Sequence, residues 1–172
     1  MKTEEKVKDN NIKAVDIASM IIIILIIVLI KNFVFTNVMV HGVSMYDTLH
    51  DKDIMVLNII GPKLNGYKRF DIVVIKTKDT KIIKRVIGLP GETVEYKDNQ
   101  LYINGKKVKD NHGTYKTDDI EKVKLGKDEY YVLGDNRTDS ADSRVIGPIK
   151  KSKMMGKASL TIFPFNRIGF KK

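Results

Sequence analysis

Ser44 is the residue whose setting first suggests chemistry. It follows Gly42-Val43, at the end of a strand predicted over residues 38–43. Glycine lets the backbone come close to a bound substrate because it has no side chain. A serine hydroxyl becomes an effective nucleophile only when a neighbouring base takes its proton. Ser44 therefore predicts nucleophilic catalysis if a base lies within reach, and an ordinary turn serine if none does.

The three histidines are poor candidates for that base. His41 lies three residues from Ser44 on the same strand approach, and His50 and His112 lie in polar, turn-like segments. None has an obvious carboxylate partner to orient its ring. The sequence therefore points to a base of another residue type.

Lys84 has the surroundings that a lysine base requires. Residues two apart share one face of a strand, so Lys84 shares a face with Ile82 and Val86. Burial among apolar side chains lowers the pKa of a lysine, and the neutral amine can then act as a general base near neutral pH. The alternative is the common one, in which the lysine lies on the solvated face of its strand.

A third segment, GDNRTDSADSR from Gly134 to Arg144, is dense in polar residues. By itself it is typical of a loop with Asx turns. His50, Asp51 and Asp53 are likewise more typical of a polar turn than of a metal site. The sequence therefore predicts no metal and no cofactor.

These residues must be positioned by a mainly-β domain. Short apolar runs alternate with turn residues and predict strands over residues 38–43, 54–58, 71–77, 81–87, 93–96, 100–103, 129–133 and 157–163. A hairpin is expected over 91–108, and the polar stretch over 109–128 is expected to be an exposed loop, so that 91–128 forms a small cap. We expect the sheets to close or fold over, because open sheet edges need protection.

An apolar run precedes this domain. Residues 20–30 (MIIIILIIVLI) are apolar without a break and show no 3.6-residue stripe, which favours a membrane anchor over a buried core helix. No Ala-x-Ala-like triplet follows, so we expect the segment to stay uncleaved. The interpretation is a cytoplasmic tail over 1–13, a transmembrane anchor over 14–35 and an extracytoplasmic catalytic domain over 36–172. The tail carries four lysines against three acidic residues, a weak positive-inside signal.

Composition limits the other function classes. The 172 residues carry a formal charge of +10 and no cysteine. The lack of cysteine excludes disulfides, thiol nucleophiles and Cys-based zinc sites. Lysine greatly outnumbers arginine, with no interleaved Arg and aromatic residues, so the basic charge suits a lipid surface better than nucleic acid.

At this point four ordered segments resemble the motifs of type I signal peptidases, the membrane-bound Ser/Lys leader peptidases of bacteria. VSMYDTL is similar to the nucleophile motif Ser-Met-x-Pro-Thr-Leu, and FDIVVIK to the core-strand motif that follows it. IIKRVIGLPGE is similar to the general-base motif, and GDNRTDSADSR matches the final motif almost letter for letter. The resemblance covers the anchor and most of the chain after it.

The resemblance implies a role for each matching position. Ser44 would be the nucleophile and Lys84 its general base. Ser140 would hydrogen-bond the lysine amine, Asp142 and Arg144 would form an ion pair that braces the site, and Arg85 would be structural. The oxyanion would meet the backbone N–H of Ser44. The small pockets for the substrate's −1 and −3 side chains would be lined by Met45, Leu49 and Ile83.

The resemblance also implies the fold, the substrate and the partners. The fold would be a single N-terminal transmembrane helix followed by a catalytic domain of two antiparallel β-sheets. The enzyme would sit in the cell membrane and cut signal peptides from secreted preproteins after small residues at −3 and −1. Its partners would be those signal peptides, the lipid bilayer and the protein-export machinery. Phe33, Phe35, Phe163 and Phe165 would suit the bilayer interface.

Two positions depart from the family pattern. Asp47 stands where the family usually has proline, which removes a fixed φ and adds a charge near the nucleophile. Gly42 stands where some members have a serine that completes the oxyanion hole.

Two other functions are weighed against this one. A catalytically silent homologue that binds exported peptides has only Asp47 in its favour. A repressor-type Ser/Lys autoprotease would need a DNA-binding helix-turn-helix and an internal Ala-Gly pair, and the chain has neither.

Overall fold

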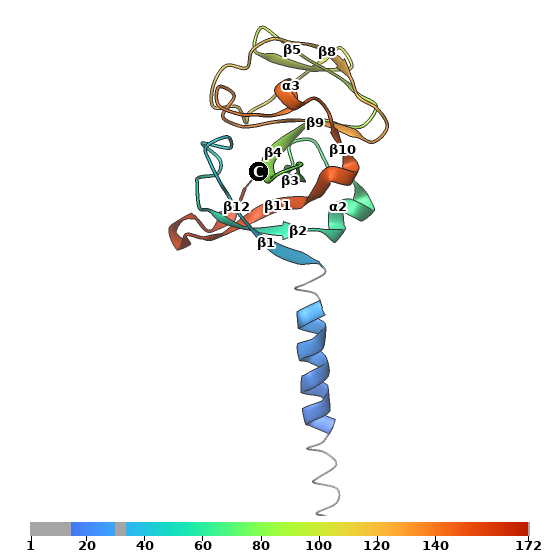
Figure 1. The fold of residues 1–172 in the computed structure, drawn as a ribbon, viewed down its shortest axis with the longest axis vertical. Helices are drawn as coiled ribbons and strands as arrows, with labels where there is room; N and C mark the ends of the chain where they lie inside the picture. Colours follow the sequence, from blue (N-terminus) through green and yellow to red (C-terminus); the bar gives the residue numbers. More distant parts are fainter. Residues whose placement is uncertain (1–14, 30–33, 172) are drawn as a thin grey trace, which may run out of the picture.

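The computed structural model of the chain describes residues 15–29 and 34–171. Residues 15–29 form an α-helix whose large apolar side chains are all exposed, and Figure 1 shows it apart from the β-rich remainder. No helix in these described ranges is both long and apolar enough to cross a membrane. The membrane-spanning helix expected over 14–35 is therefore not supported, although residues 14 and 30–33 of that range, like the tail over 1–13, lie outside the described residues.

An eight-stranded antiparallel sheet forms the larger part of the fold, which confirms the prediction of a mainly-β chain. Its order is β1-β2-β11-β3-β4-β9-β10, and β12 pairs with β11. The strands are β1 Phe35–Met39, β2 Ile54–Asn58, β3 Ile72–Lys76, β4 Lys81–Gly88, β9 Glu129–Leu133, β10 Ile149–Lys150, β11 Met154–Phe163 and β12 Gly169–Phe170. Neighbours in sequence such as β3 and β4 form hairpins, whereas β11 returns from the C-terminal part of the chain to lie between β2 and β3.

The central strands β3 and β4 are buried along most of their length. Both are rich in Ile and Val, whose branched side chains favour the pleated conformation and pack on both faces of a covered sheet. In their antiparallel register Val73 pairs with Lys84 and Ile72 pairs with Arg85. The two adjacent basic residues of β4 therefore start from the middle of the sheet and project to opposite faces.

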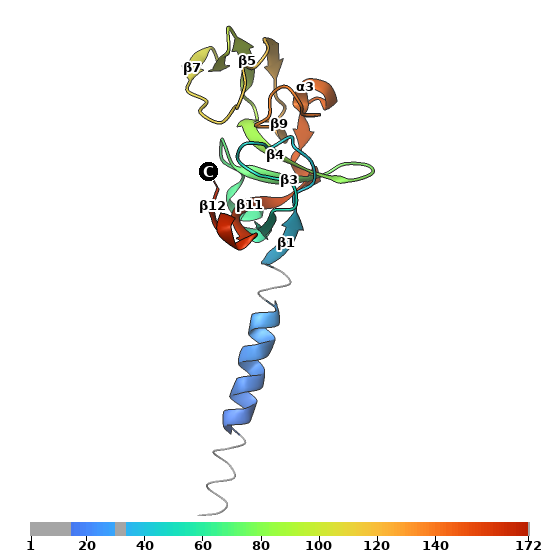
Figure 2. The same ribbon diagram turned by 90° about the vertical axis from the view of Figure 1, so that its left-hand side faces the viewer.

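A smaller antiparallel sheet, the cap sheet, has the order β7-β6-β5-β8. Its strands are β5 Thr93–Lys97, β6 Gln100–Ile103, β7 Lys106–Val108 and β8 Ile120–Lys124. Figure 2 shows it at the end of the domain farthest from the apolar helix. The stretch over 109–128, expected to be an exposed loop, instead contributes β8 and the buried side chain of Thr117. The sequence did not predict this strand, because most of its residues are charged and only one side of β8 is apolar.

Short helices lie where the sequence indicated only turns. They are α2 Ile60–Asn65, α3 Ser143–Ile146 and the 3-10 turns η1 Lys151–Lys153 and η2 Phe165–Arg167. Pro62 lies in the first turn of α2, a position that proline fits because its missing N–H has no partner to lose there. The side chain of Asp142 caps α3 by accepting a hydrogen bond from the Arg144 backbone N–H.

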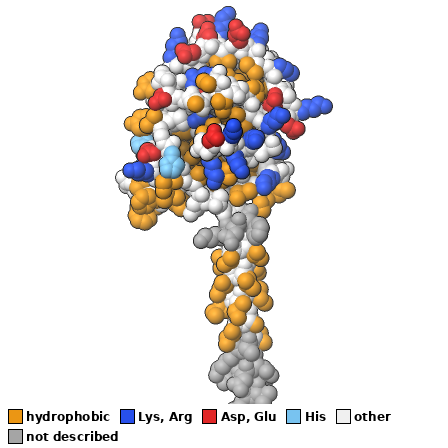
Figure 3. Space-filling view, in the orientation of Figure 1, with side chains coloured by type: hydrophobic (Ala, Val, Ile, Leu, Met, Phe, Trp, Pro, Cys, Tyr) orange, Lys and Arg blue, Asp and Glu red, His pale blue; other side chains and the backbone are white. Residues whose placement is uncertain are grey.

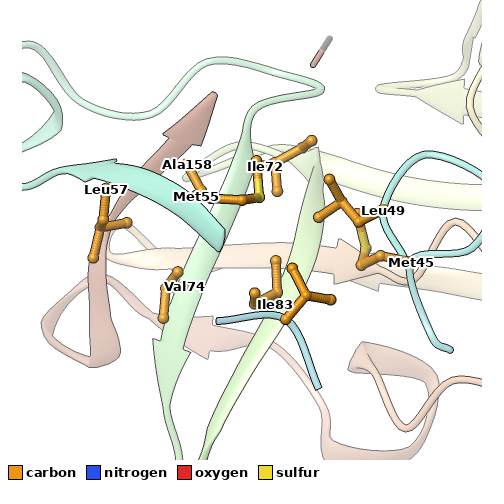
Figure 4. Close-up of a cluster of buried hydrophobic side chains, with 9 residues drawn as sticks. Met45, Leu49, Met55, Leu57, Ile72, Val74, Ile83 and Ala158 are labelled. Atoms are coloured by element: carbon orange, nitrogen blue, oxygen red, sulfur yellow. The ribbon is translucent and has the colours of Figure 1, made fainter. Parts of the chain in front are cut away.

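Three buried apolar clusters hold the sheets together. The first joins side chains of β2, β3, β4 and β11 to Met45 and Leu49 from the turn after β1, as Figure 4 shows. The second joins β4 and β9 of the large sheet to β5, β6 and β8 of the cap sheet. The cap sheet therefore shares a core with the large sheet, and the loop after β9 lies next to that shared core.

Candidate active site

Ser44 lies in a turn that follows β1, where the Tyr46 N–H donates to the Val43 carbonyl over 2.9 Å. Gly42, just before it, has a φ of +83°, a left-handed conformation that glycine adopts with little strain. The Gly42 N–H donates to Asp51 Oδ1 over 2.9 Å, and a side chain at Gly42 would meet nothing within 4 Å. A serine would therefore have room at position 42, and the backbone conformation is what favours glycine there.

The structure brings Lys84 to Ser44. The amine Nζ of Lys84 donates to Ser44 Oγ over 2.6 Å, although the two residues are 40 positions apart in the chain. Ser44 is partly exposed, whereas Lys84 is only 3% exposed. A substrate can therefore reach the hydroxyl while water is largely kept from the amine.

Burial is the main influence on the amine, and it lowers the pKa of Lys84. The carboxylates of Asp142 and Asp135 act in the opposite direction, and the guanidinium of Arg144 lowers the pKa further. The balance favours the neutral amine compared with a lysine in water. A neutral amine has a lone pair, so it can accept the proton of the hydroxyl that it contacts.

Arg85, the next residue, is fully buried on the opposite face of β4. Its guanidinium makes a two-pronged ion pair with Asp135, with Nε–Oδ1 of 2.7 Å and a second N–O distance of 2.6 Å, and also donates to the Phe70 carbonyl. Thr48 Oγ1 donates to the same carboxylate over 2.6 Å. Arg85 thus ties β4, the turn of Ser44 and the loop after β9 together, a structural position like the one that the resemblance implied.

The loop after β9 carries the predicted ion pair. Arg144 contacts Asp142 through Nε and a terminal nitrogen, at 2.9 and 2.8 Å, and the second oxygen of Asp142 also accepts from the Gly134 N–H. Burial alone would raise the pKa of Asp142, but the hydrogen bonds and charge of Arg144 and the Gly134 N–H lower it below its usual value. Asp142 therefore stays ionised next to Lys84.

Ser140 was expected to hydrogen-bond the amine of Lys84, and the structure does not contain that bond. The Ser140 hydroxyl is buried without a hydrogen-bond partner among the described residues. It packs against Gly134, where an added Cβ would lie 2.2 Å from Ser140 Oγ and 2.4 Å from the Ser44 carbonyl oxygen. The hydroxyl is thus near the nucleophile's backbone, and only glycine fits between the two.

Asn136 fixes the backbone of the nucleophile, a contact that sequence reasoning missed. Its N–H donates to the Ser44 carbonyl over 3.1 Å, and its side-chain amide donates to the Val43 carbonyl over 3.3 Å. Within residues 34–171 the Ser44 N–H itself donates no hydrogen bond. That N–H is therefore available to a negative oxygen that develops next to Ser44 Oγ.

The three residues assigned to substrate pockets are buried in the apolar core. Met45, Leu49 and Ile83 are 2%, 0% and 8% exposed and belong to one core cluster (Figure 4). Met45 and Leu49 are thus core residues here, because the turn after Ser44 packs its apolar side chains inward. Their part in a substrate pocket stays a prediction.

No metal centre is evident in the described ranges, where no group of three or more His, Cys, Asp or Glu side chains is arranged to hold an ion. The arrangement offers a nucleophile, a proton acceptor and an N–H donor, which together suit acyl transfer. The contacts of Asn136 with Ser44 and Val43, and of Asp135 with Thr48, join residues far apart in the chain. Their positions inside the recognisable GDNR and SMYDTL segments were the only sequence signal for them.

The sequence model of the family described as signal peptidase, peptidase S26, matches residues 14–163. Signal peptidase I of Bacillus amyloliquefaciens is 40% identical, with 98% of this chain and 98% of that protein covered. Signal peptidase I S of Bacillus subtilis (strain 168) is 39% identical, with 87% and 89% covered. The solved signal peptidase I from Enterococcus faecalis V583 is 34% identical, covers 53% of this chain and 95% of that chain, and has a TM-score of 0.49. The family match includes Ser44, Lys84 and the whole loop over 134–144.

Proposed function

This chain belongs to the signal peptidase family, peptidase S26, and on that basis we propose that it removes signal peptides from exported preproteins with Ser44 as nucleophile and Lys84 as general base. The observation that carries the proposal is the 2.6 Å contact between Lys84 Nζ and Ser44 Oγ, with the amine almost fully buried. A contact between a serine and a charged surface lysine would not support this chemistry, because an ammonium cannot accept a proton.

The reaction proceeds by acyl transfer. Lys84 takes the proton of Ser44 Oγ as that oxygen attacks the scissile carbonyl carbon, and the negative oxygen of the tetrahedral intermediate accepts from the Ser44 N–H. The intermediate collapses when Lys84 returns the proton to the leaving amine, which departs as the mature protein. Lys84 then deprotonates a water that attacks the acyl-enzyme, and the signal peptide leaves with a new carboxyl end while Ser44 regains its proton.

Five neighbours support the pair. Arg85 and Asp135 hold β4 against the loop after β9, and the ion pair of Asp142 and Arg144 holds the far side of that loop. Ser140 contributes a buried hydroxyl that packs against Gly134, close to the nucleophile's backbone. These contacts limit the motion of the amine relative to the hydroxyl, which favours reaction because productive geometry is already formed.

Cleavage follows small side chains at the −3 and −1 positions of the substrate. Met45, Leu49 and Ile83 are packed into one apolar cluster, which supports pockets with a filled apolar floor. A filled floor excludes large side chains sterically, which discriminates more strongly than the loss of a methylene from a deep pocket.

The enzyme acts at the cell membrane, with its N-terminus in the cytoplasm and its catalytic domain outside. Two surfaces support attachment to the membrane: the apolar helix over 15–29, and an apolar cluster formed by Phe163, Phe165, Ile168 and Phe170 around η2 and β12. Figure 3 shows hydrophobic side chains gathered at this lower edge of the domain. Both are suited to contact lipid next to the export machinery that delivers preproteins.

The test is cleavage of a preprotein by the full chain in detergent micelles, with the new N-terminus sequenced. Ser44→Ala and Lys84→Met should each lower kcat by at least about a thousandfold, since each removes one half of a unit that acts together. Lys81→Met, which removes an exposed lysine from the same strand, should keep full activity. Full activity of Lys84→Met at neutral pH would refute the assigned base, and a wild-type chain that binds signal peptides without cutting them would indicate the silent homologue.

A further inference from the structure

The hydroxyl of Thr114 forms hydrogen bonds with both the N–H and the carbonyl of one peptide bond next to the nucleophile. Thr114 Oγ1 accepts a hydrogen bond from the Asp47 N–H over 3.2 Å and donates one to the Tyr46 carbonyl over 2.9 Å. That N–H and that carbonyl belong to the peptide bond between Tyr46 and Asp47, two residues beyond Ser44. The two contacts cross 67 and 68 positions of sequence, so the hydroxyl joins separate parts of the fold.

Thr114 is itself held in place. Its N–H donates to the Asp135 carbonyl over 3.0 Å, in the same loop that fixes the Ser44 carbonyl through Asn136. The preceding Gly113 lies against Arg137, since a Cβ there would be 2.8 Å from the guanidinium carbon. The hydroxyl of Thr114 is therefore a fixed point against which the turn of Ser44 can be held.

The same segment is anchored to the cap sheet through Arg137. Its guanidinium is paired with Asp110 at 2.6 Å, both side chains being nearly fully buried, and it also bonds Thr117 Oγ1 and the Tyr96 hydroxyl of β5. Arg137 Nε donates to the Gly134 carbonyl over 3.0 Å. Residues 110–117 thus form a strap with buried anchors near both ends and Thr114 between them.

The turn is packed mainly on one side. Met45 is buried in the core, whereas Tyr46 and Asp47 are exposed, and the Tyr46 ring contacts the His50 ring of the same turn with centroids 4.8 Å apart. Asp47 stands where the resembled motif has proline, whose ring would fix φ. Aspartate leaves φ free but supplies a backbone N–H, which proline lacks, and Thr114 uses that N–H.

We infer that Thr114 is a positioning residue for Ser44: its hydroxyl supplies by two hydrogen bonds the rigidity that a proline ring at position 47 would supply covalently. The inference rests on the proposed function, because it concerns the geometry of the same nucleophile. Thr114 touches neither Ser44 Oγ nor Lys84, so it acts through the backbone of the turn. Small displacements of a nucleophile are costly in rate, because the attacking atom must be aligned with the carbonyl.

The experiment compares three variants of the full chain in detergent, with kcat and KM measured on one preprotein. Thr114→Val keeps the shape and removes the hydroxyl, so kcat should fall about tenfold, the effect of losing roughly two solvent-exposed hydrogen bonds, with KM within about twofold of wild type. Thr114→Ser keeps the hydroxyl and should retain most of the kcat. Thr36→Val, the same change at an exposed position of β1, should leave both constants unchanged.

A second comparison tests the link to position 47. In an Asp47→Pro background the hydroxyl has no N–H to accept, so Thr114→Val should lower kcat by only about twofold, a non-additive result expected of coupled positions. An unchanged kcat in Thr114→Val, an equal loss in Thr114→Ser, or the full tenfold loss persisting with proline at position 47 would each overturn the inference while the wild type still cleaves. A wild-type chain that cleaves nothing would overturn the proposed function itself.

Discussion

Lys84 combines a functional property with a cost in stability. Because its pKa is lowered by burial, the folded chain binds that proton less tightly than the unfolded chain does. Between the folded-state pKa and about 10.4 the unfolded chain therefore carries more protons, so the free energy of unfolding rises with pH across that window. At neutral pH the packing around β3 and β4 must offset this penalty.

The lowered pKa of Lys84 predicts a specific pH profile. kcat/KM should rise with pH as the amine loses its proton, and the midpoint of that rise should lie clearly below about 10.4, the value for a lysine in water. The measurement is kcat/KM of the full chain on a preprotein between about pH 5 and 10, in one detergent at constant ionic strength. A midpoint at or above the ordinary lysine value would mean that the amine is not kept neutral by its surroundings.

Ser44 and Lys84, which the structure brings into contact, each have a local signal in the sequence. Ser44 follows a glycine at a strand end, and Lys84 stands among Ile and Val at alternating positions. Thr114 and Asn136 have no such signal: each lies in a polar stretch, and its contact with the nucleophile turn depends on the tertiary fold. The same reason applies to Ser140, whose hydroxyl is placed against Gly134 by the tertiary packing of its loop.

At the scale of elements, the junction between the two sheets depends on Gly88 at the end of β4. A Cβ at this position would lie 2.3 Å from Val94 Cγ2 and 2.8 Å from Leu125 Cδ1, both in the core cluster that the sheets share. Glycine allows β4 and the cap sheet to approach at that distance. The cap sheet is thus attached to the rest of the domain through close packing as well as through the Arg137 and Asp110 pair.

Gly88→Ala should therefore destabilise the fold. We expect a loss of about 1–3 kcal/mol in the free energy of unfolding, typical of an added methyl in a filled core. Gly126→Ala is the matched control, since the nearest atoms there are at the flexible end of Glu129. Chemical denaturation followed by circular dichroism measures both. Equal stability of the two variants would show that the junction accommodates the added methyl group and does not depend on glycine at position 88.

Strands with a clear apolar pattern were predicted within a few residues, and for some the bounds agree. The ranges 54–58, 100–103 and 129–133 coincide with β2, β6 and β9. β8 was missed because charged residues fill most of its length, and β1 lies earlier than the predicted 38–43 because it pairs through mostly exposed residues. Burial, which the sequence does not display, decides these cases.

For the molecule as a whole, two apolar surfaces suggest that lipid contributes to function. Besides the helix over 15–29, Phe165 and Phe170 are 78% and 77% exposed on the C-terminal side of the domain. The free energy of an exposed aromatic side chain is lower at a bilayer interface than in water. The formal charge of +10 adds a long-range attraction to anionic headgroups.

Replacing these two aromatics should affect membrane-bound substrate selectively. For the full chain in liposomes, the double change Phe165→Ser and Phe170→Ser should lower cleavage of an inserted preprotein several-fold, because less apolar surface holds the domain at the interface. Cleavage of a short soluble peptide in detergent should be unaffected. Leu64→Ser, a change of similar exposure on α2, is the control and should alter neither rate. An equal effect on both substrates would indicate that these aromatics support the fold of the catalytic domain and not its contact with lipid.

The alternation of side chains along β4 also limits where a residue can be inserted into the chain. Lys84 and Arg85 are consecutive, so the strand turns one toward Ser44 and the other toward Asp135. One extra codon between them would bring both to the same side, placing a permanent cation beside an amine that the proposed mechanism requires to be neutral. One extra codon in the 77–80 turn would only lengthen a loop. Insertions can therefore accumulate at that turn during evolution, whereas no residue can be inserted between Lys84 and Arg85.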